Sequence, residues 1–375
     1  MKRAILFTLI ACLAAACAQP GRRRSDGGDV TADSVRYARG FSIHHYDNYT
    51  VVDLTDPWDT ARLLQRYVLV DRRNPLPPIL PTGTVVMTPL RNIVVYTSVH
   101  AAIIEELGEA GRITGVCEPQ YINSPAVREL IRRGEVADLG MSTAPNVEKM
   151  VDMGAECIIA SPFQNSGYGQ AEKLGIPIIE AADYMEALPL GRAEWVLFYG
   201  LLLGRRAEAE AIFRATEERY LALRDMALGV AGRPEVFSEK RYGSFWYVPS
   251  GDSYMARLFH DAGADYSFAH IPGQGSTPLV FETVLDRAVH AGFWLIKYNQ
   301  EGDMSYRELR SEYAPYENFD AFRQRNIYAC NTNDTPYYEE FPMHPDYLLG
   351  DLIHIFHPSL LPGYTPRYYR PLSDR

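Results

Sequence analysis

The sequence predicts an α/β protein with two lobes, each built on a parallel β-sheet with helices on both faces, joined by one long α-helix. Three observations support this prediction. Short apolar strands alternate with helical segments from residue 92 to residue 179, a pattern that is typical of buried parallel strands. One long helical segment then runs from Ala207 to Met226. Strands and helices alternate again after it, which predicts the second lobe.

The first lobe opens with two strands that are rich in β-branched and aromatic residues, Tyr49–Asp53 and Tyr67–Asp71. Pro57 is expected to open a short helix between them. Ser98 is expected to cap the helix that follows the first apolar strand. The expected apolar strands cover residues 92–96, 113–117, 136–140, 157–160 and 176–179. The other expected helices cover residues 125–134, 146–153 and 170–174.

Two helices are expected to connect the lobes, over residues 194–203 and 207–226. In the longer one, apolar side chains recur at the spacing of a helix that buries one face. The second lobe is expected to have strands at 243–248 and 293–298, with a strand-like Leu279 between them. Its expected helices cover residues 253–261, 282–290, a segment from Tyr306, and residues 344–357.

Composition excludes several classes of protein. The chain has 375 residues and a formal net charge of −10, without a long run of Lys and Arg, which argues against a nucleic-acid partner. After the opening segment, no stretch is apolar over the roughly 18 residues that a membrane-spanning helix needs. Cys117, Cys157 and Cys330 are odd in number and far apart, so no disulfide framework is expected. Cys157 lies in the apolar run CIIA and is expected to be buried.

Residues 1–16 have the pattern of a secretory signal, with a basic start, an apolar run and small residues. The run ends in Cys17 and resembles a bacterial lipoprotein signal, in which this Cys carries the lipid chains, palmitate among them. Cys12 is the alternative lipidated residue, and a plain cleaved secretion signal is the other interpretation. Residues 17–40 are expected to form a flexible tether. The expected location is the cell envelope, facing the periplasm, and which membrane carries the anchor stays open.

Four blocks follow one another in the first half: IVVYTSVHAAIIEELG, RITGV, PNVEKMVDMGAECIIASP and LGIPII. Their order resembles the first lobe of the iron-complex and cobalamin substrate-binding proteins of ABC importers. The second half is similar more loosely, through YMARLFHDAGADYSF, PLVFETVLDRA and AGFWLI. The resemblance covers residues 91–296, and the tail NTNDTPYYEEFPMHPDYLLGDLIHIFHP looks like an extended bacterial variant of the same group.

The resemblance implies a clamshell of two Rossmann-like lobes, residues 41–190 and 233–375, with a helical linker over 191–232. One siderophore complex, haem or cobalamin would bind in the cleft between the lobes, and an ABC permease dimer with its ATPase subunits would receive it. The protein itself would be a monomer that has no cofactor and catalyses no reaction. Ligands of open α/β sheets bind outside the carboxyl ends of the strands, which agrees with a site in the cleft.

The resemblance also implies two docking residues. Glu148 lies at the start of the PNVEKM helix, and Glu282 holds the corresponding position in VFETVL. In the family, one glutamate at each position docks onto arginines of the permease. Without that role, both carboxylates would simply stabilise the N-terminal turns of their helices through the helix dipole.

Ligand contacts are expected from loops at strand ends, where aromatic rings can cover the flat faces of a chelate. The candidates are Tyr96, Ser98, His100, Tyr121, Ser142, Phe163, Tyr168, Trp246, Tyr247 and Gln274. His100 is the candidate axial ligand to a chelated metal. These loops contain almost no Arg or Lys, which favours a neutral or hydrophobic chelate such as cobalamin, unless folding brings Arg241 or Lys297 inward.

Two alternatives of other classes stay open. A transport protein that binds Zn or Mn directly would need three or four His, Asp or Glu side chains at the cleft. The cleft loops offer His100 and few carboxylates. A secreted enzyme could use the same scaffold, because fold does not determine function.

Overall fold

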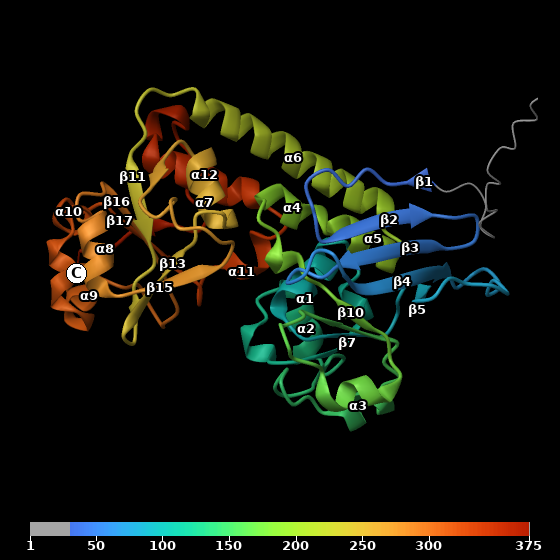
Figure 1. Ribbon diagram of the computed structural model, residues 1–375. Coiled ribbons are helices and arrows are strands. Elements are labelled where there is room, and N and C mark those ends of the chain that lie inside the picture. Colours follow the sequence, from blue (N-terminus) through green and yellow to red (C-terminus); the bar gives the residue numbers. More distant parts are fainter. Residues whose placement is uncertain (1–30, 375) are drawn as a thin grey trace, which may run out of the picture.

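The computed structural model describes residues 31–374. The signal segment, Cys12 and Cys17 lie outside the described residues. The described chain forms two α/β lobes, and helix α6 (Arg206–Leu228) extends along both of them (Figure 1). The predicted fold class is thus confirmed. Within residues 31–374, no helix is both long enough and apolar enough to cross a membrane.

The sheet of the first lobe is parallel throughout, with the strand order β10-β9-β6-β7-β8. Its strands are β6 (Ile93–Val95), β7 (Ile113–Val116), β8 (Ala137–Asp138), β9 (Cys157–Ala160) and β10 (Ile178–Glu180). All five predicted strands are present, within a few residues of the expected bounds. Every residue of β6 and β9 is buried, as their uninterrupted apolar sequences predict, and Cys157 is fully inaccessible.

The helices of the first lobe connect these strands. They are α1 (Ser98–Glu106), α2 (Pro125–Arg132) and α3 (Val147–Asp152). Ser98 was expected to be the cap of α1, but it is the first helical residue, and the side chain of the preceding Thr97 makes no capping hydrogen bond. The segment expected as a helix at 170–174 is a tighter 3₁₀ helix, Gly169–Leu174.

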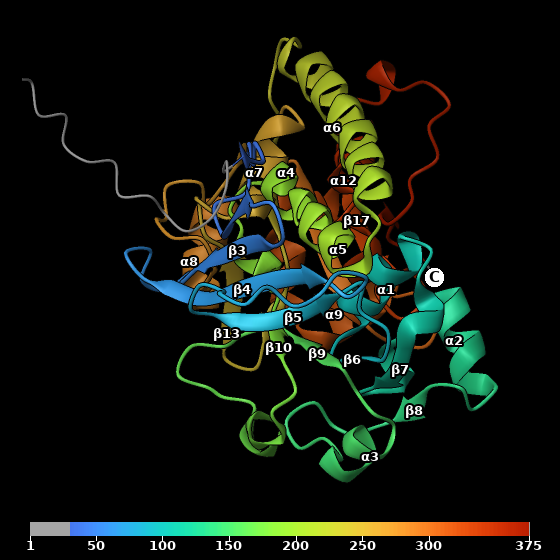
Figure 2. The same ribbon diagram turned by 90° about the vertical axis from the view of Figure 1, so that its right-hand side faces the viewer.

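An additional sheet lies beside the first lobe, with the order β1-β2-β3-β4-β5. Its strands are β1 (Thr31–Ala32), β2 (Phe41–His45), β3 (Thr50–Thr55), β4 (Leu63–Asp71) and β5 (Thr84–Thr88). The two strands predicted here are β3 and β4, and they belong to this sheet rather than to the parallel one. The sheet lies against the linker helix α5 (Val196–Leu203) (Figure 2). At this contact the rings of Phe41 and Trp195 pack edge to face, with centroids 5.0 Å apart.

The short helix expected at Pro57 is absent, and this prediction was wrong. The segment after β3 is a pair of turns. The Asp56 carboxylate accepts hydrogen bonds from the backbone N–H groups of Trp58, at 2.9 Å, and Asp59, at 3.2 Å. An Asp side chain that bonds the backbone two and three residues onward stabilises a turn as well as a helix start, so this signal was ambiguous.

The linker contains α4 (Pro189–Glu194) and α5 (Val196–Leu203) before α6. The helix expected at 194–203 is thus divided at Trp195. Glu194 is fully buried, and its carboxylate accepts the backbone N–H groups of Arg36, Tyr37 and Ala38, each at 2.8 Å. These bonds fix the segment between β1 and β2 to the linker.

The second lobe has a sheet with the order β14-β11-β16-β17-β18, in which only β18 is antiparallel. These strands are β11 (Glu235–Ser238), β14 (Asp265–Tyr266), β16 (Phe293–Tyr298), β17 (Ile327–Asn331) and β18 (Arg370–Pro371). The strand predicted at 243–248 was expected to begin this sheet, and that was wrong. It is β13 (Phe245–Pro249), which lies in a separate antiparallel sheet. Its partners there are β12 (Arg241–Tyr242) and β15 (Ser276–Leu279).

Helices cover the second sheet and reach the first lobe. They are α7 (Tyr254–Asp261), α8 (Phe281–Ala288), α9 (Tyr306–Glu312), α10 (Asp320–Arg323), α11 (Tyr337–Glu340) and α12 (Pro345–Phe356). Helix α11 packs against α1 of the first lobe. His344, just before α12, bonds Glu106 of α1 with Nε2 to Oε1 at 2.7 Å. The two lobes therefore touch on one side.

Candidate ligand-binding site

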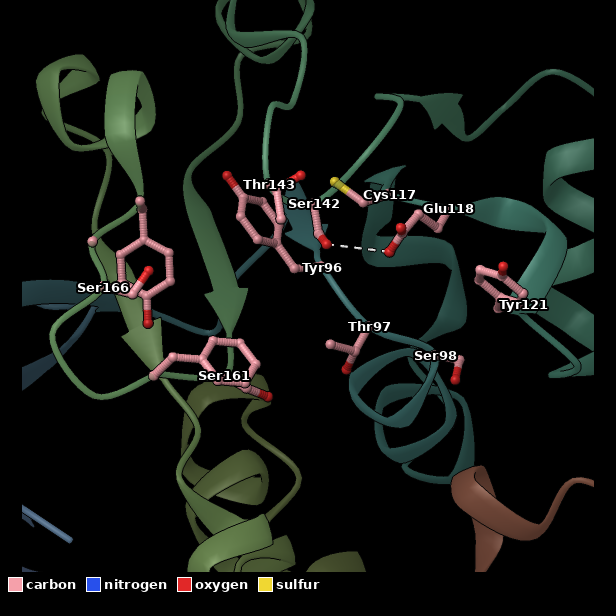
Figure 3. A pocket seen from close by; sticks show the side chains of 13 residues that line it. Tyr96, Thr97, Ser98, Cys117, Glu118, Tyr121, Ser142, Thr143, Ser161 and Ser166 are labelled. Carbon is pink, nitrogen blue, oxygen red and sulfur yellow. Dashed lines mark hydrogen bonds between the residues drawn. The ribbon is translucent and has the colours of Figure 1, made fainter. Parts of the chain in front are cut away.

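A cavity of about 340 Å³ opens at the carboxyl ends of β6, β7 and β9 in the first lobe (Figure 3). This is where an open parallel sheet is expected to hold a ligand. The residues that line it are Tyr96, Thr97, Ser98, Cys117, Glu118, Tyr121, Ser142, Thr143, Ser161, Phe163, Ser166, Gly167 and Tyr168. Six of the ten predicted contact residues are among them, namely Tyr96, Ser98, Tyr121, Ser142, Phe163 and Tyr168.

Aromatic rings and hydroxyl groups share the walls of this cavity. The rings of Tyr96 and Tyr168 face each other edge to face, with centroids 6.4 Å apart. Phe163 is 64% exposed and Tyr121 is 63% exposed, which is unusual for aromatic side chains of this size. An exposed aromatic side chain beside a cavity is well suited to cover an apolar ligand surface.

Two buried hydroxyl groups at the cavity have no hydrogen-bond partner. They are the phenol oxygen of Tyr96 and Oγ1 of Thr97. Buried polar atoms are nearly always hydrogen-bonded, so two unpartnered oxygens in the wall of one cavity are unusual. Burial also raises the pKa of Tyr96, which keeps its phenol protonated and able to donate.

Glu118 is the one charged residue among those that line the cavity. Its Oε2 accepts a hydrogen bond from the Ser142 hydroxyl at 3.2 Å (Figure 3). The backbone of Glu118 is left-handed, with φ 51° and ψ 55°. Burial raises the pKa of the neighbouring Cys117 thiol to about 12, so this side chain is a neutral thiol. Sequence reasoning missed Glu118, because an isolated Glu after a strand is not part of any motif.

His100 lies behind the cavity wall rather than in it, which corrects the expectation that it reaches the cleft. It is 1% exposed. Its Nδ1 lies 3.3 Å from the carbonyl oxygen of Ile159, and its Nε2 lies 3.4 Å from Oγ of Ser161. The third position of α1 points toward β9, so the imidazole packs on the sheet and Ser161 stands between it and the cavity. Burial lowers the pKa of His100.

Three predicted contact residues of the second lobe lie elsewhere. Trp246 is fully buried in the core, and its indole N–H donates to the carbonyl of Ser238 at 2.9 Å. Tyr247, next to it on β13, points the other way and is 44% exposed. Gln274 lines a separate, smaller cavity of about 120 Å³, together with residues of the β3–β4 turns and the segment before α4.

Neither cation considered for the cleft lines the cavity. The ammonium group of Lys297 forms an ion pair with Glu239. Burial alone would lower the pKa of Lys297, but Glu239 and nearby tyrosines raise it well above its usual value. The guanidinium of Arg241 lies over the ring of Tyr313, 4.0 Å from its centroid.

The two predicted docking residues occupy equivalent places in the two lobes. Glu148 is in the first turn of α3 and Glu282 is in the first turn of α8. Both side chains are exposed. Each is thus available to a partner and is stabilised by the dipole of its own helix.

Comparison with known proteins identifies similar chains. The profile of a family described as periplasmic binding protein matches residues 93–333. An uncharacterized lipoprotein of Methanocaldococcus jannaschii is 25% identical over 361 residues, which cover 89% of this chain and 84% of that protein.

Solved structures share the fold. A periplasmic heme binding protein from Pseudomonas aeruginosa matches with a TM-score of 0.58 at 17% identity, covering 76% of this chain and 99% of that one. IsdE of S. aureus, in complex with heme, matches with a TM-score of 0.56 at 16% identity, covering 71% of this chain and 99% of that one. At such low sequence identity, these structural matches establish a similar fold and nothing more.

Proposed function

Because the chain belongs to the periplasmic binding protein family, we propose that it captures a metal chelate and delivers it to an ABC permease dimer and its ATPase subunits. The chelate would be an iron–siderophore complex, haem or cobalamin. The protein would act as a monomer and would catalyse no reaction, since its partners hydrolyse the ATP.

One observation supports this proposal above the others. The cavity in the first lobe draws its lining from four separate loops, which follow β6, β7, β8 and β9. Aromatic rings and hydroxyl groups both line it, a composition typical of ligand pockets that combine apolar cover with a few oriented polar groups. A ligand there would also satisfy the unpartnered oxygens of Tyr96 and Thr97.

The finer assignments of site residues are part of the same proposal. We expect Tyr96, Ser98, Tyr121, Ser142, Phe163 and Tyr168 to contact the chelate in the first lobe. Tyr247 and Gln274 could approach only from the second lobe. Glu148 and Glu282 would dock onto the permease. With one exposed carboxylate on each lobe, docking would depend both on where the protein sits on the permease and on how far its two lobes are open.

The N-terminal region extends the proposal to the membrane. We expect Cys17 to carry the lipid, the chain from there to residue 30 to act as a tether, and the folded protein to face the periplasm from the cell envelope. The tether was expected to extend to residue 40, and that bound was wrong, because β1 and the bonds from Glu194 to residues 36–38 place residues 31–40 in the folded part. The similar M. jannaschii chain is named a lipoprotein, which supports this expectation. Two acyl chains on one residue would provide stable anchoring, because a single chain binds membranes only marginally.

The alternative of direct Zn or Mn binding has no specific observation in its favour. Among residues 31–374, no group of three or more His, Cys, Asp or Glu side chains is arranged to hold a metal ion.

Binding to a panel of chelates tests the proposal. The full chain in mild detergent would be mixed with cyanocobalamin, haemin and a set of ferric siderophores, and native mass spectrometry with absorbance would report binding. We expect a one-to-one complex with one of them. Phe163→Ala should weaken that complex roughly tenfold, since an exposed aromatic anchor is lost. Ile79→Ala, an exposed apolar residue of the N-terminal sheet region, is the matched control. Absence of binding across the panel would overturn the proposal.

A further inference from the structure

The backbone around Glu118 is held in an uncommon conformation. A residue with a Cβ adopts left-handed φ and ψ only at an energetic cost, so the surrounding structure must hold it there. Its N–H donates to the carbonyl of Gly140 at 2.9 Å, and its carbonyl accepts the N–H of Tyr121 at 3.0 Å. This conformation directs the side chain from the end of β7 toward Ser142 at the cavity (Figure 3). Strain of this kind is common at ligand-binding positions.

The Glu118 carboxylate has no cationic partner within the described chain. In residues 31–374, no Lys, Arg or His forms an ion pair with it, and its side-chain hydrogen-bond partner is Ser142. Glu239 in the second lobe is a useful comparison, because it is also left-handed, with φ 69°, and it is paired with Lys297. Because Glu118 is only partly buried and lines the cavity, a cationic group of a ligand can reach its unpaired carboxylate.

The direction of the hydrogen bonds can be worked out for Ser161. A carbonyl oxygen only accepts, so the bond between Ile159 and His100 requires the hydrogen to be on Nδ1 of His100. The buried imidazole is neutral, because burial lowers its pKa. Its Nε2 therefore accepts, and the Ser161 hydroxyl donates to it. The lone pairs of Ser161 Oγ are left for the cavity.

The direction of the hydrogen bond of Ser142 follows from the same reasoning. A carboxylate only accepts, so the Ser142 hydroxyl donates to Glu118, and its oxygen can only accept from a ligand. The cavity thus presents three groups that can only accept, which are the Glu118 carboxylate and the oxygens of Ser142 and Ser161, beside other hydroxyl groups that can donate or accept. It presents no cation to balance them.

We infer that the chelate held in this cavity carries a positive charge, with a protonated nitrogen directed at Glu118 and a further N–H or O–H group directed at Ser161. This inference rests on the proposed function and specifies its ligand class. A charge-assisted hydrogen bond to Glu118 would provide affinity. An anionic chelate would meet a carboxylate with no compensating cation, and that repulsion would provide discrimination.

Charge-matched chelates test the inference whatever the identity of the natural ligand. Three classes would be offered, each in a cationic, a neutral and an anionic form. The siderophores are ferrioxamine B, its N-acetyl derivative and its N-succinyl derivative. The corrinoids are a cyanocobalamin derivative with a primary amine, cyanocobalamin itself and a cyanocobalamin monocarboxylate. The iron porphyrins carry primary ammonium, methyl ester or propionate groups. Dissociation constants would be measured with the full chain in mild detergent.

In whichever class binds, we expect the cationic form to bind roughly tenfold more tightly than the neutral form, and the anionic form to bind most weakly. Glu118→Gln should reduce the cationic preference to about twofold or less. Asp152→Asn, which removes one exposed carboxylate of the same lobe outside the cavity, should leave the preference intact.

Each contrary result has a distinct meaning. If the neutral or anionic form binds as tightly as the cationic one, or if Glu118→Gln keeps the tenfold preference, the charge assignment is overturned while capture of a chelate stands. If no form of any class binds, the proposed capture itself is overturned.

Discussion

Glu339 of α11 accepts a hydrogen bond from the backbone N–H of Asn123 at 2.6 Å, and so joins the second lobe to the first. Glu339 is 5% exposed, and Asn123 directly precedes Ser124, the N-cap residue of α2. Glu105 of α1 accepts the N–H groups of Ala126 and Val127 in the first turn of α2, and Glu339 adds a bond to the segment just before that helix. The lobes are therefore connected by a polar bond as well as by the linker.

Removing this carboxylate should destabilise the contact between the lobes. Glu339→Ala leaves the part-buried N–H group of Asn123 without this partner, which costs about 1 kcal/mol of unfolding free energy. Chemical denaturation measures this loss, and small-angle scattering would report whether the lobes separate further. Glu135→Ala, an exposed carboxylate of the first lobe, serves as control. Equal stability of the two variants would show that the bond contributes nothing.

The same residue predicts a pH dependence. Burial raises the pKa of Glu339 above its unfolded value, so between those two pKa values the folded state binds more protons than the unfolded state. The contribution of Glu339 to unfolding free energy should therefore increase as pH falls through that window and decrease as pH rises. The unfolding free energies of the unaltered chain and of Glu339→Gln, measured by denaturation at a series of pH values, isolate the contribution of this carboxyl group. The Gln variant should have the flatter profile, and parallel profiles would contradict the assignment.

Glu118→Gly should separate stability from binding. Glycine adopts left-handed φ and ψ without steric cost, so relief of strain offsets the greater entropy of the unfolded chain. We expect unfolding free energy to stay equal or to rise by up to about 1 kcal/mol. Chelate binding should weaken at the same time. Glu135→Gly, at a position without positive φ, should instead lose stability in the same denaturation assay.

Trp246→Phe should affect stability alone. The substitution leaves a gap in the core and an unpaired carbonyl at Ser238, which together should cost about 2 kcal/mol. Because the indole does not line the cavity, the dissociation constant of a bound chelate should change less than about twofold. Titration of the variant with the chelate, at a temperature where the variant is fully folded, measures this constant. A large loss of affinity would show that Trp246 contributes to the ligand site after all.

The double variant Glu148→Ala, Glu282→Ala should uncouple capture from transport. Both side chains are exposed on helix starts, so chelate affinity and stability should hardly change. Import by cells that carry the matching permease should fall roughly tenfold or more, since rim charges set docking and register. The control is the double variant Glu135→Ala, Glu301→Ala, which removes one exposed carboxylate from each lobe away from the two docking positions. Cells that carry this variant should import the chelate normally. Unimpaired import by the first variant would exclude the docking role.

The first lobe could be predicted closely because its strands are short and wholly apolar. A strand such as Cys157–Ala160 fits only a sheet covered on both faces, and the polar residues that follow such strands meet at one edge. Tyr96, Ser142 and Phe163 were found by this rule. Their role as ligand contacts stays a prediction.

The second lobe was harder because its first strand carries polar residues. Glu235–Ser238 is flanked by charged residues, whereas the aromatic run at Phe245 has a stronger strand pattern. Because the stronger pattern was chosen, the strand that contains Trp246 was assigned to the parallel sheet of the second lobe, whereas it lies in the separate antiparallel sheet. His100 was misplaced for another reason, since sequence gives its place in α1 but not the direction of its side chain. The left-handed backbone of Glu118 depends on tertiary contacts and has no local signature.

The bonds between Glu194 and the backbone of residues 36–38 have a mechanical consequence. Any pull on the chain ahead of Thr31 first meets the short pairing of β1 with β2, and then the buried carboxylate of α4. The load would therefore be shared between the N-terminal sheet and the linker helices.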